Sequence, residues 1–164
     1  MAVRRLNHAV LYIRDVGRAV DFYTATLHFE VAHLYPGRAA FLRAAGSDND
    51  HDLGLFALGD DAPGPHRGQV GLYHLAWEVG TLGELVAAGE RLKSRNALVG
   101  ASDHGVSKSF YAKDPDGNEF EVLWRVPRPD WPAGDVGTHP LDLDTALDRW
   151  GPDLATGAAA GSAT

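Results

Sequence analysis

The chain repeats one pattern of strand and helix signals, and this repeat limits what it can fold into. Leu6-Asn7-His8 and Leu72-Tyr73-His74 align with an offset of 66 residues (72 minus 6). Each motif opens a segment with strand character, which is followed by a helix signal and three further short strands. We therefore predict two tandem β-α-β-β-β modules, over about residues 4–58 and 71–126.

Turn and capping residues delimit the segments of the first module. We predict a strand over residues 3–13 with Leu6, His8, Val10 and Tyr12 on one face, because side chains alternate along a strand. Asp15 then caps a helix whose apolar residues recur at helical spacing. Pro-Gly and polar loop signals separate three further strands, expected at residues 30–34, 39–44 and 51–58.

The second module follows a stretch rich in Gly, Pro and Asp, residues 59–68, which is typical of a linker. A strand is expected over residues 72–79, and Thr81-Leu82-Gly83-Glu84 forms a capping box that opens a helix. Asp114-Pro115-Asp116-Gly117 favours a tight turn, because proline presets φ and glycine accepts the positive φ that follows. The strands are expected at residues 97–101, 106–113 and 118–125, so this turn should close a hairpin.

The chain changes character after the second module. Three prolines between residues 127 and 132 indicate an extended arm, residues 127–164, beyond a domain of residues 1–126. One short helix is expected at residues 143–150. Residues 155–164, rich in Ala and Gly, should lack fixed structure unless something docks them. Whether the arm covers a pocket or a partner subunit stays open.

Composition excludes several classes of function. The chain has no cysteine, so any metal must be held by His, Asp or Glu. The apolar run behind the N-terminal arginines is too short for a signal peptide or a membrane span, so we expect a soluble cytoplasmic protein with no membrane partner. A formal charge of −7 with scattered basic residues gives no sign of nucleic-acid binding.

Three residues form a candidate metal site. Glu121 sits among apolar residues in a strand that should be buried, and a buried carboxylate needs a partner such as a metal ion. His8 and His74 occupy equivalent places in the two modules, so pairing of the modules about a pseudo-twofold axis would bring them together. Two imidazoles and one carboxylate are typical of non-haem Fe(II) oxygenases. A single histidine on an apolar strand face is more often a core residue than a ligand, and Glu119 is the rival carboxylate.

These motifs resemble those of the vicinal oxygen chelate superfamily, and most closely a single-domain extradiol ring-cleavage dioxygenase. The resemblance covers about residues 4–126 and is most specific in Asp114-Pro-Asp-Gly-Asn-Glu-Phe-Glu121. It implies an α+β fold in which the two tandem β-α-β-β-β modules form a pseudo-twofold half-barrel. It also implies Fe(II), or Mn(II) or another divalent metal, held by His8, His74 and Glu121.

The resemblance implies three catalytic residues as well. His51, in His51-Asp52-Leu53, matches the acid-base histidine of extradiol enzymes, and by alternation it should share a face with Leu53 and Leu55. Tyr111 and His104 match the tyrosine and the second histidine that hydrogen-bond the substrate. The alternatives are a solvent-facing His51, a packed strand tyrosine and a turn histidine. The remaining histidines (His28, His33, His66 and His139) are expected at the surface.

The expected reaction is ring cleavage of a catechol-type aromatic diol with O2, carried out by a homodimer or higher homo-oligomer. Subtracting 66 from Glu121 gives Leu55, where lactoylglutathione lyases of this superfamily carry a fourth protein ligand. Leucine cannot bind a metal, which favours an open metal face and dioxygen chemistry. A metal-dependent isomerase, epimerase or lyase is the first alternative, and an antibiotic-binding resistance protein is the second. Whether the modules pair within one chain or between two stays open.

Overall fold

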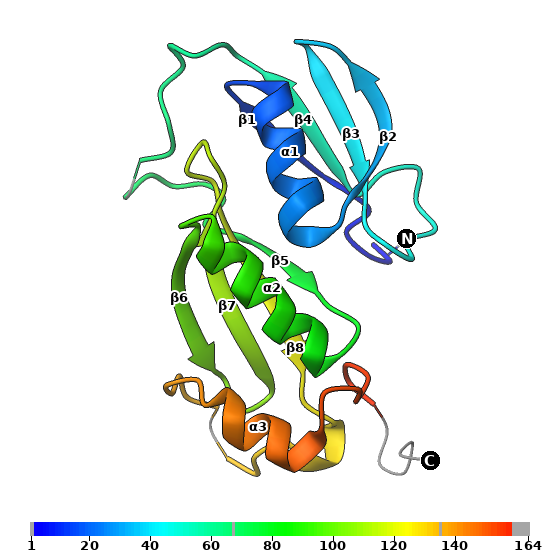
Figure 1. The fold of residues 1–164 in the computed structure, drawn as a ribbon, viewed down its shortest axis with the longest axis vertical. Helices are drawn as coiled ribbons and strands as arrows, with labels where there is room; N and C mark the ends of the chain where they lie inside the picture. Colours follow the sequence, from blue (N-terminus) through cyan, green and yellow to red (C-terminus); the bar gives the residue numbers. More distant parts are fainter. Residues whose placement is uncertain (1, 67, 135, 159–164) are drawn as a thin grey trace. The chain divides into compact units, whose positions relative to one another are not determined.

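The computed structural model describes residues 2–66, 68–134 and 136–158, which form two compact units. Unit 1 comprises residues 1–69 together with the turn 114–118, and unit 2 comprises residues 70–113 and 119–164. Each unit holds one four-stranded mixed sheet with a helix, in the order β-α-β-β-β (Figure 1). The α+β class and the two tandem modules predicted from the sequence are therefore confirmed, and both sheets are open rather than closed into a barrel.

Unit 1 contains one helix and the first four strands. The sheet order is β1-β4-β3-β2, with β1 parallel to β4 and the other neighbours antiparallel. The elements are β1 (Ala9–Ile13), α1 (Val16–Leu27), β2 (Glu30–Tyr35), β3 (Ala39–Arg43) and β4 (Leu53–Ala57). As predicted, the side chain of Asp15 caps α1 by accepting a hydrogen bond of 2.7 Å from the backbone N–H of Arg18.

The sheet of unit 1 has one buried and one open face. The strand residues of the buried face, which packs with α1, are at most 7% exposed: Leu11, Ile13, Ala40, Leu42, Leu53 and Leu55. On the other face, Val10 and Tyr12 are 53% and 70% exposed. The open face therefore carries apolar side chains that the unit's own helix does not cover.

Three predicted strands begin two or more residues later in the structure than expected, and the difference matters for the histidines. β1 begins at Ala9 rather than residue 3, β4 at Leu53 rather than residue 51, and β5 at Leu75 rather than residue 72. The reason for β1 is a lack of partners, since its neighbour β4 begins opposite Ala9 and the preceding loop forms no strand. His8 and His74 consequently lie immediately before strands.

Unit 2 repeats the arrangement with the second set of strands. The sheet order is β5-β8-β7-β6, and β5 is parallel to β8. The elements are β5 (Leu75–Glu78), α2 (Leu82–Ser94), β6 (Leu98–Asp103), β7 (Ser107–Lys113) and β8 (Glu119–Arg125). The predicted capping box is present, with Glu84 N–H donating to Thr81 Oγ1 and Thr81 N–H donating to Glu84 Oε2.

α2 approaches its sheet closely at one glycine. A Cβ atom added at Gly89 would lie 2.5 Å from Phe110 Cε2 on β7, so any larger residue would push helix and sheet apart. Phe110, Phe120, Val122 and Trp124 are all at most 7% exposed and form the core beneath α2. This contact identifies the face of the sheet that α2 covers, and Glu121 alternates to the other face.

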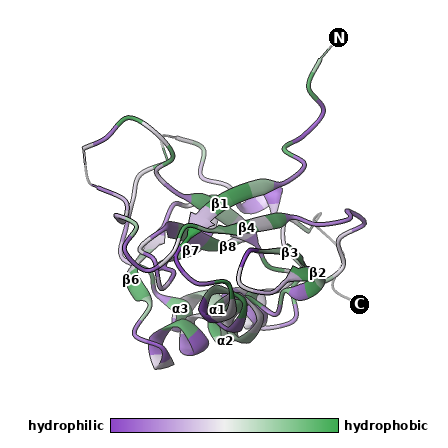
Figure 2. Cartoon of the chain, turned by 90° about the horizontal axis from the view of Figure 1, so that it is seen from above, coloured by the Kyte–Doolittle hydropathy of each residue, from purple (hydrophilic) through white to green (hydrophobic). Residues whose placement is uncertain are grey.

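The C-terminal arm contacts unit 2. It contains a 3₁₀ helix, η1 (Arg128–Asp130), and α3 (Leu143–Trp150), which spans the residues where one short helix was expected. α3 carries both hydrophilic and hydrophobic residues (Figure 2), and its Trp150 ring lies 5.4 Å from the ring of the buried Trp124. The described part of the expected unstructured tail is docked, since Thr156 N–H donates to Gly80 O and Gly157 N–H to Arg125 O. Residues 159–164 lie outside the described residues.

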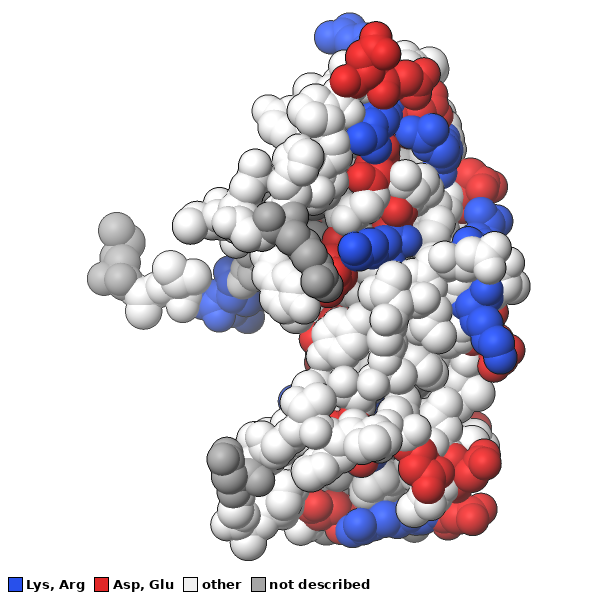
Figure 3. Space-filling model, turned by 90° about the vertical axis from the view of Figure 1, so that its left-hand side faces the viewer, with Lys and Arg blue, Asp and Glu red and all other residues white. Residues whose placement is uncertain are grey.

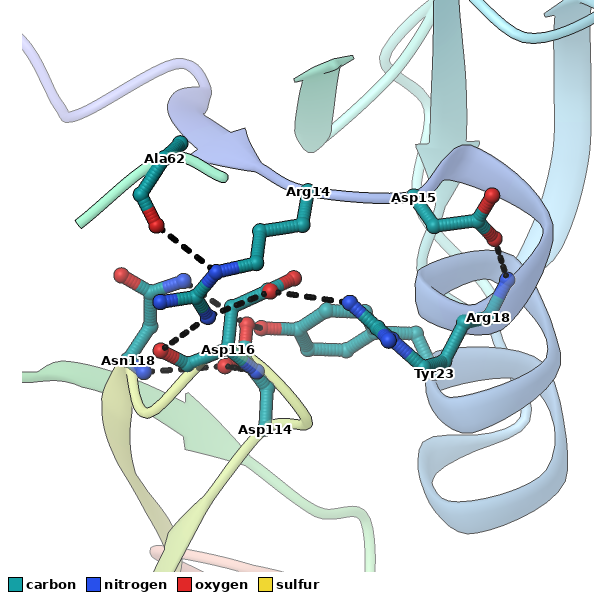
Figure 4. A network of polar contacts seen from close by, with 8 residues as sticks. All are labelled: Arg14, Asp15, Arg18, Tyr23, Ala62, Asp114, Asp116 and Asn118. Atoms are coloured by element: carbon teal, nitrogen blue, oxygen red, sulfur yellow. Dashed lines mark hydrogen bonds and ion pairs between the residues drawn. The ribbon is translucent and has the colours of Figure 1, made fainter. Parts of the chain in front are cut away.

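The predicted tight turn forms and is anchored by unit 1 residues. Gly117 has a φ of +90°, and its N–H donates to Asp114 O at 3.0 Å. The buried Asp114 carboxylate accepts from Tyr23 Oη, from two backbone N–H groups and from Asn118 Nδ2 (Figure 4). Arg14 and Arg18 both pair with Asp116 Oδ1, at 3.0 and 3.3 Å. The turn is therefore held to β1 and α1 by a polar network as well as by its own conformation.

Replacing Tyr23 with phenylalanine should lower the free energy of unfolding by about 1.5 to 3 kcal/mol at neutral pH, the range for a hydrogen bond to a charged group. Burial raises the pKa of Asp114, and the Tyr23 hydroxyl opposes that rise by donating to the ionised form. The destabilisation should therefore be largest above the pKa of Asp114 and should shrink as acid protonates it. Urea unfolding at pH 7 and pH 4 measures both values.

The matched control for this prediction is Tyr35→Phe, because Tyr35 lies on β2 and is 54% exposed. That substitution should change the free energy of unfolding by less than about 0.5 kcal/mol. Equal losses for the two variants, or a Tyr23→Phe loss that does not depend on pH, would contradict the assigned role of Tyr23.

Helix length and the distribution of charged side chains are two further features of the described residues. Within the described ranges, no helix is long and apolar enough to cross a membrane. On the face shown in Figure 3, lysine and arginine side chains lie among aspartate and glutamate side chains.

Candidate active site

Glu121 lies in a row of residues that crosses the sheet of unit 2. On β8 it pairs with Ala76 of β5 on one side and with Tyr111 of β7 on the other. Directly paired residues share a face, so this row lies on the face opposite α2. Glu121 is only 8% exposed, which agrees with the expectation that its carboxylate is buried and needs a partner.

His74 is the partner of Glu121 within unit 2. It immediately precedes β5, and its Nε2 lies 3.3 Å from Glu121 Oε2. The second ring nitrogen, Nδ1, is buried and has no hydrogen-bond partner. An imidazole nitrogen and a carboxylate oxygen that face each other are suitable ligands for one divalent cation. Glu119, the rival carboxylate, instead lies 3.9 Å from Lys113 Nζ.

Tyr111 and His104 extend this pair into a chain of hydrogen bonds. Tyr111 Oη lies 3.5 Å from Glu121 Oε1 and 2.8 Å from His104 Nε2. Since a carboxylate can only accept, the hydroxyl donates to Glu121 and accepts from His104 Nε2–H. His104 Nδ1 is then an acceptor, and Thr138 Oγ1 lies 3.4 Å from it. The directions of these hydrogen bonds thus assign the His104 tautomer that carries its proton on Nε2.

The C-terminal arm positions the outer end of this chain. Asp103 and His139 exchange two backbone hydrogen bonds of 2.9 Å, which places the adjacent Thr138 beside His104. Sequence analysis assigned the arm no role, and no sequence signal singled out Thr138. Only the tertiary contact between the arm and the end of β6 identifies it.

Burial keeps Tyr111 in its neutral form. Desolvation, followed by the nearby Glu121 carboxylate, raises the pKa of Tyr111 to about 12. A tyrosine with such a pKa retains its hydroxyl proton at physiological pH. Tyr111 is therefore available as a hydrogen-bond donor rather than as a phenolate.

Unit 1 brings together two other predicted site residues, His8 and His51. Both precede strands at the same end of the parallel β1–β4 pair, and their ring centroids lie 4.7 Å apart. The His51 ring also meets the Phe41 ring edge-on at 4.9 Å. His8 Nδ1 lies 2.9 Å from Asn7 Oδ1.

The expected orientation of His51 is wrong. We predicted that it shares a face with Leu53 and Leu55, but those side chains are fully buried on the face that packs with α1. His51 instead packs against Phe41, which pairs with Gly54 on the open face. The alternation fails because β4 begins two residues after His51, so His51 does not obey the period of the strand.

Sequence analysis also missed a carboxylate that joins two histidines in unit 1. Asp50 Oδ2 lies 2.8 Å from His51 Nδ1, and Asp50 Oδ1 lies 3.1 Å from His33 Nε2. Hydrogen bonds from His51 and then His33 lower the pKa of Asp50. The sequence shows that Asp50 and His51 are neighbours. His33 on β2, the second histidine that contacts Asp50, was predicted only as a surface residue.

The position equivalent to Glu121 in unit 1 is Gly54 rather than Leu55. An offset of 66 residues relates Val10 to Ala76, and these residues pair with Gly54 and Glu121 respectively. The two sheets therefore differ in register by one residue, which simple subtraction could not reveal. Glycine has no side chain, so the conclusion that unit 1 supplies no carboxylate at this position remains.

The three predicted metal ligands are divided between the units. His8 belongs to unit 1, whereas His74 and Glu121 belong to unit 2. Among residues 2–66, 68–134 and 136–158, no group of three or more His, Cys, Asp or Glu side chains is gathered so as to hold a metal ion. Imidazole nitrogens and a carboxylate are suitable ligands for a divalent cation. Of the three predicted ligands, the structure places His74 and Glu121 in contact.

The structure is an α+β protein of two tandem β-α-β-β-β modules, each with an open mixed sheet. In each module a histidine, His8 or His74, immediately precedes the first strand. A family model described as the Glyoxalase/Bleomycin resistance protein/Dioxygenase superfamily matches residues 5–122. The chain belongs to this superfamily, which contains the vicinal oxygen chelate fold predicted from the sequence. A domain of the same description from Frankia sp. EAN1pec has a TM-score of 0.61 at 18% identity and covers 76% of this chain and 100% of its own.

Two curated relatives are similar to most of this chain. A catechol-2,3-dioxygenase of Bacillus subtilis (strain 168) is 30% identical over 160 residues, covering 92% of this chain and 54% of the relative. Metapyrocatechase 2 of Cupriavidus necator is 29% identical over 159 residues, covering 92% of this chain and 45% of the relative. The chain thus spans about half the length of the curated relatives it matches.

Proposed function

We propose that this chain cleaves the ring of a catechol-type aromatic diol with O2, using a divalent metal held by His8, His74 and Glu121. The observation that carries the proposal is the pairing of His74 with the buried Glu121 carboxylate at 3.3 Å, beside Tyr111. The names of the relatives at about 30% identity support the same chemistry. Fe(II) is the proposed ion, with Mn(II) or another divalent metal as the substitute to be tested.

The residues of unit 2 suit the proposed metal. A carboxylate that is 8% exposed carries a large desolvation cost unless a positive charge compensates it. The buried Nδ1 of His74 has no hydrogen-bond partner, so no hydrogen bond at that nitrogen holds the ring in place. When bound, the ion would bring the catecholate and dioxygen into contact and lower the pKa of the coordinated phenol, as it does for bound water.

The other site residues are proposed to handle protons and substrate oxygens. His51 would accept the second phenolic proton and later return a proton, a role suited to imidazole near neutral pH. Tyr111 would donate a hydrogen bond to a substrate oxygen, because its pKa of about 12 keeps its hydroxyl proton in place. His104 would orient Tyr111 through their 2.8 Å hydrogen bond.

The unit 1 position that corresponds to Glu121 favours dioxygen chemistry over isomerisation. Neither Gly54 nor Leu55 can bind a metal, so three protein ligands would leave open positions for a diol and O2. We further propose that the chain acts as a homodimer or higher homo-oligomer, with a solution mass at least about twice the 17.6 kDa of one chain. Light scattering during size-exclusion chromatography measures that mass.

Oxygen consumption tests the proposal directly. Protein purified anaerobically and reconstituted with Fe(II) should consume O2 with at least one member of a catechol panel and form a yellow ring-opened product. The phenol and the dimethyl ether matching each active catechol are the controls, because they lack the vicinal pair of hydroxyl groups and should give neither signal. Lack of uptake with every catechol, at one bound metal per site, would reject ring cleavage.

A further inference from the structure

We propose that Asp50 is a positioning residue that holds His51 with its proton on Nδ1, leaving Nε2 as the proton acceptor, and that His33 anchors the other oxygen of Asp50. The inference rests on the proposed function, because it takes His51 as the residue that accepts the substrate proton. It adds two residues, Asp50 and His33, to the proposed site residues of unit 1. Neither had a role in the argument from the sequence.

The hydrogen bonds of Asp50 determine the His51 tautomer. An ionised carboxylate only accepts, so the 2.8 Å contact between Asp50 Oδ2 and His51 Nδ1 requires a proton on Nδ1. A neutral imidazole carries one proton, so Nε2 then has the free lone pair that a general base needs. The pKa of Asp50 is lowered by its hydrogen bonds with His51 and His33, which keeps the acceptor ionised.

His33 fixes the carboxylate from the opposite side. Its Nε2 lies 3.1 Å from Asp50 Oδ1, so the two oxygens of one carboxylate serve two histidines. His33 pairs with Phe41 across β2 and β3, and His51 packs against the same Phe41 ring. Asp50 is 70% exposed in its side chain, so the two contacts act mainly on orientation rather than on stability.

The loop that carries Asp50 is fastened immediately after it. Asp52 N–H donates to Leu42 O at 2.8 Å, and the Asp52 carboxylate accepts from Ala44 N, Ser47 Oγ and Asn49 Nδ2 at 2.7 to 2.9 Å. These bonds hold the backbone beside His51 in one place. A defined backbone is what allows a short aspartate side chain to reach the neighbouring ring.

Tautomer measurement tests the proposal without metal or turnover. In metal-free, 15N-labelled protein, long-range 1H–15N spectra should show neutral His51 protonated on Nδ1, with the signal assigned by its absence in His51→Ala. Asp50→Asn should reverse the tautomer, because the amide can donate to Nδ1, and Asp50→Ala should leave a mixture. Asp48→Asn is the matched control, since Asp48 is 89% exposed and pairs with Arg5, and it should leave His51 unchanged. An unchanged tautomer in both Asp50 variants would overturn the proposal.

Turnover provides the second readout. Asp50→Asn should lower kcat by at least about 10-fold, the lower end of the effects seen for residues that orient a metal ligand or a catalytic base, with little change in KM. His33→Leu should lower kcat about 2- to 10-fold, and His33→Gln should restore it, because glutamine can donate to Asp50 in place of Nε2–H. A kcat for Asp50→Asn equal to that of Asp48→Asn would overturn the positioning role. Failure of the wild-type protein to cleave any catechol would instead reject the proposed function, and the tautomer spectra would still decide the contact.

Discussion

Replacing Glu121 with alanine should lower the rate of ring cleavage by more than about 100-fold. Residues that only hydrogen-bond to metal ligands typically cost about 10- to 100-fold when mutated, and loss of a ligand itself should cost more. The same substitution should lower the amount of Fe(II) retained per chain after gel filtration. Glu121 is the only carboxylate that the structure places beside His74 among the described residues, at 3.3 Å. Metal analysis by mass spectrometry and oxygen uptake with the best catechol measure the two effects.

Two comparisons separate loss of the ligand from loss of the fold. Removing a buried carboxylate from the metal-free protein removes a desolvation cost, so the metal-free variant should remain folded. Glu119→Ala is the matched control on β8, because the Glu119 side chain faces Lys113 at 3.9 Å. If Glu119→Ala loses the metal and Glu121→Ala keeps it, the rival carboxylate is the ligand.

Replacing His51 with alanine should lower kcat by about 100- to 10,000-fold, the usual contribution of a general acid-base residue. Metal content should stay at the wild-type value, because His51 packs against His8 through its ring but is not one of the proposed ligands. Pre-steady-state absorbance of the bound catechol should show normal binding followed by slow ring opening. His66→Ala is the control, since His66 is an exposed histidine in the linker.

Two results would contradict the assigned role of His51. Wild-type turnover in His51→Ala would remove it from the mechanism. Loss of metal in step with activity would make it a ligand or a support for His8 rather than a base. The second result is informative because the ring centroids of His8 and His51 are only 4.7 Å apart.

Local signals in the sequence predicted most of the secondary structure. Asp15 and the Thr81–Glu84 capping box begin their helices where expected, because a cap depends on residues three apart in the chain. The turn ending at Gly117 is local in the same sense. The repeat of 66 residues relates the first residues of β1 and β5 and of α1 and α2. Such features need no knowledge of distant contacts.

Strand ends, and everything that depends on them, required the tertiary structure. A strand extends only as far as a neighbour can pair with it, so β1 starts at Ala9 and β4 at Leu53, and the face predicted for His51 was wrong. Register between strands is likewise a property of two segments, which is why Gly54 rather than Leu55 matches Glu121.

Residue types, by contrast, were informative about chemistry before any contact was known. Without cysteine, and with a glutamate in an apolar strand, the sequence by itself restricted a metal site to histidine and carboxylate ligands. Only the folded chain showed that His74 faces Glu121, that His104 bonds Tyr111, and that Asp50 joins His33 to His51. The physical reason is that polar contacts of about 3 Å between residues 7, 17 and 47 positions apart depend on how strands pair, and composition carries no information about that pairing.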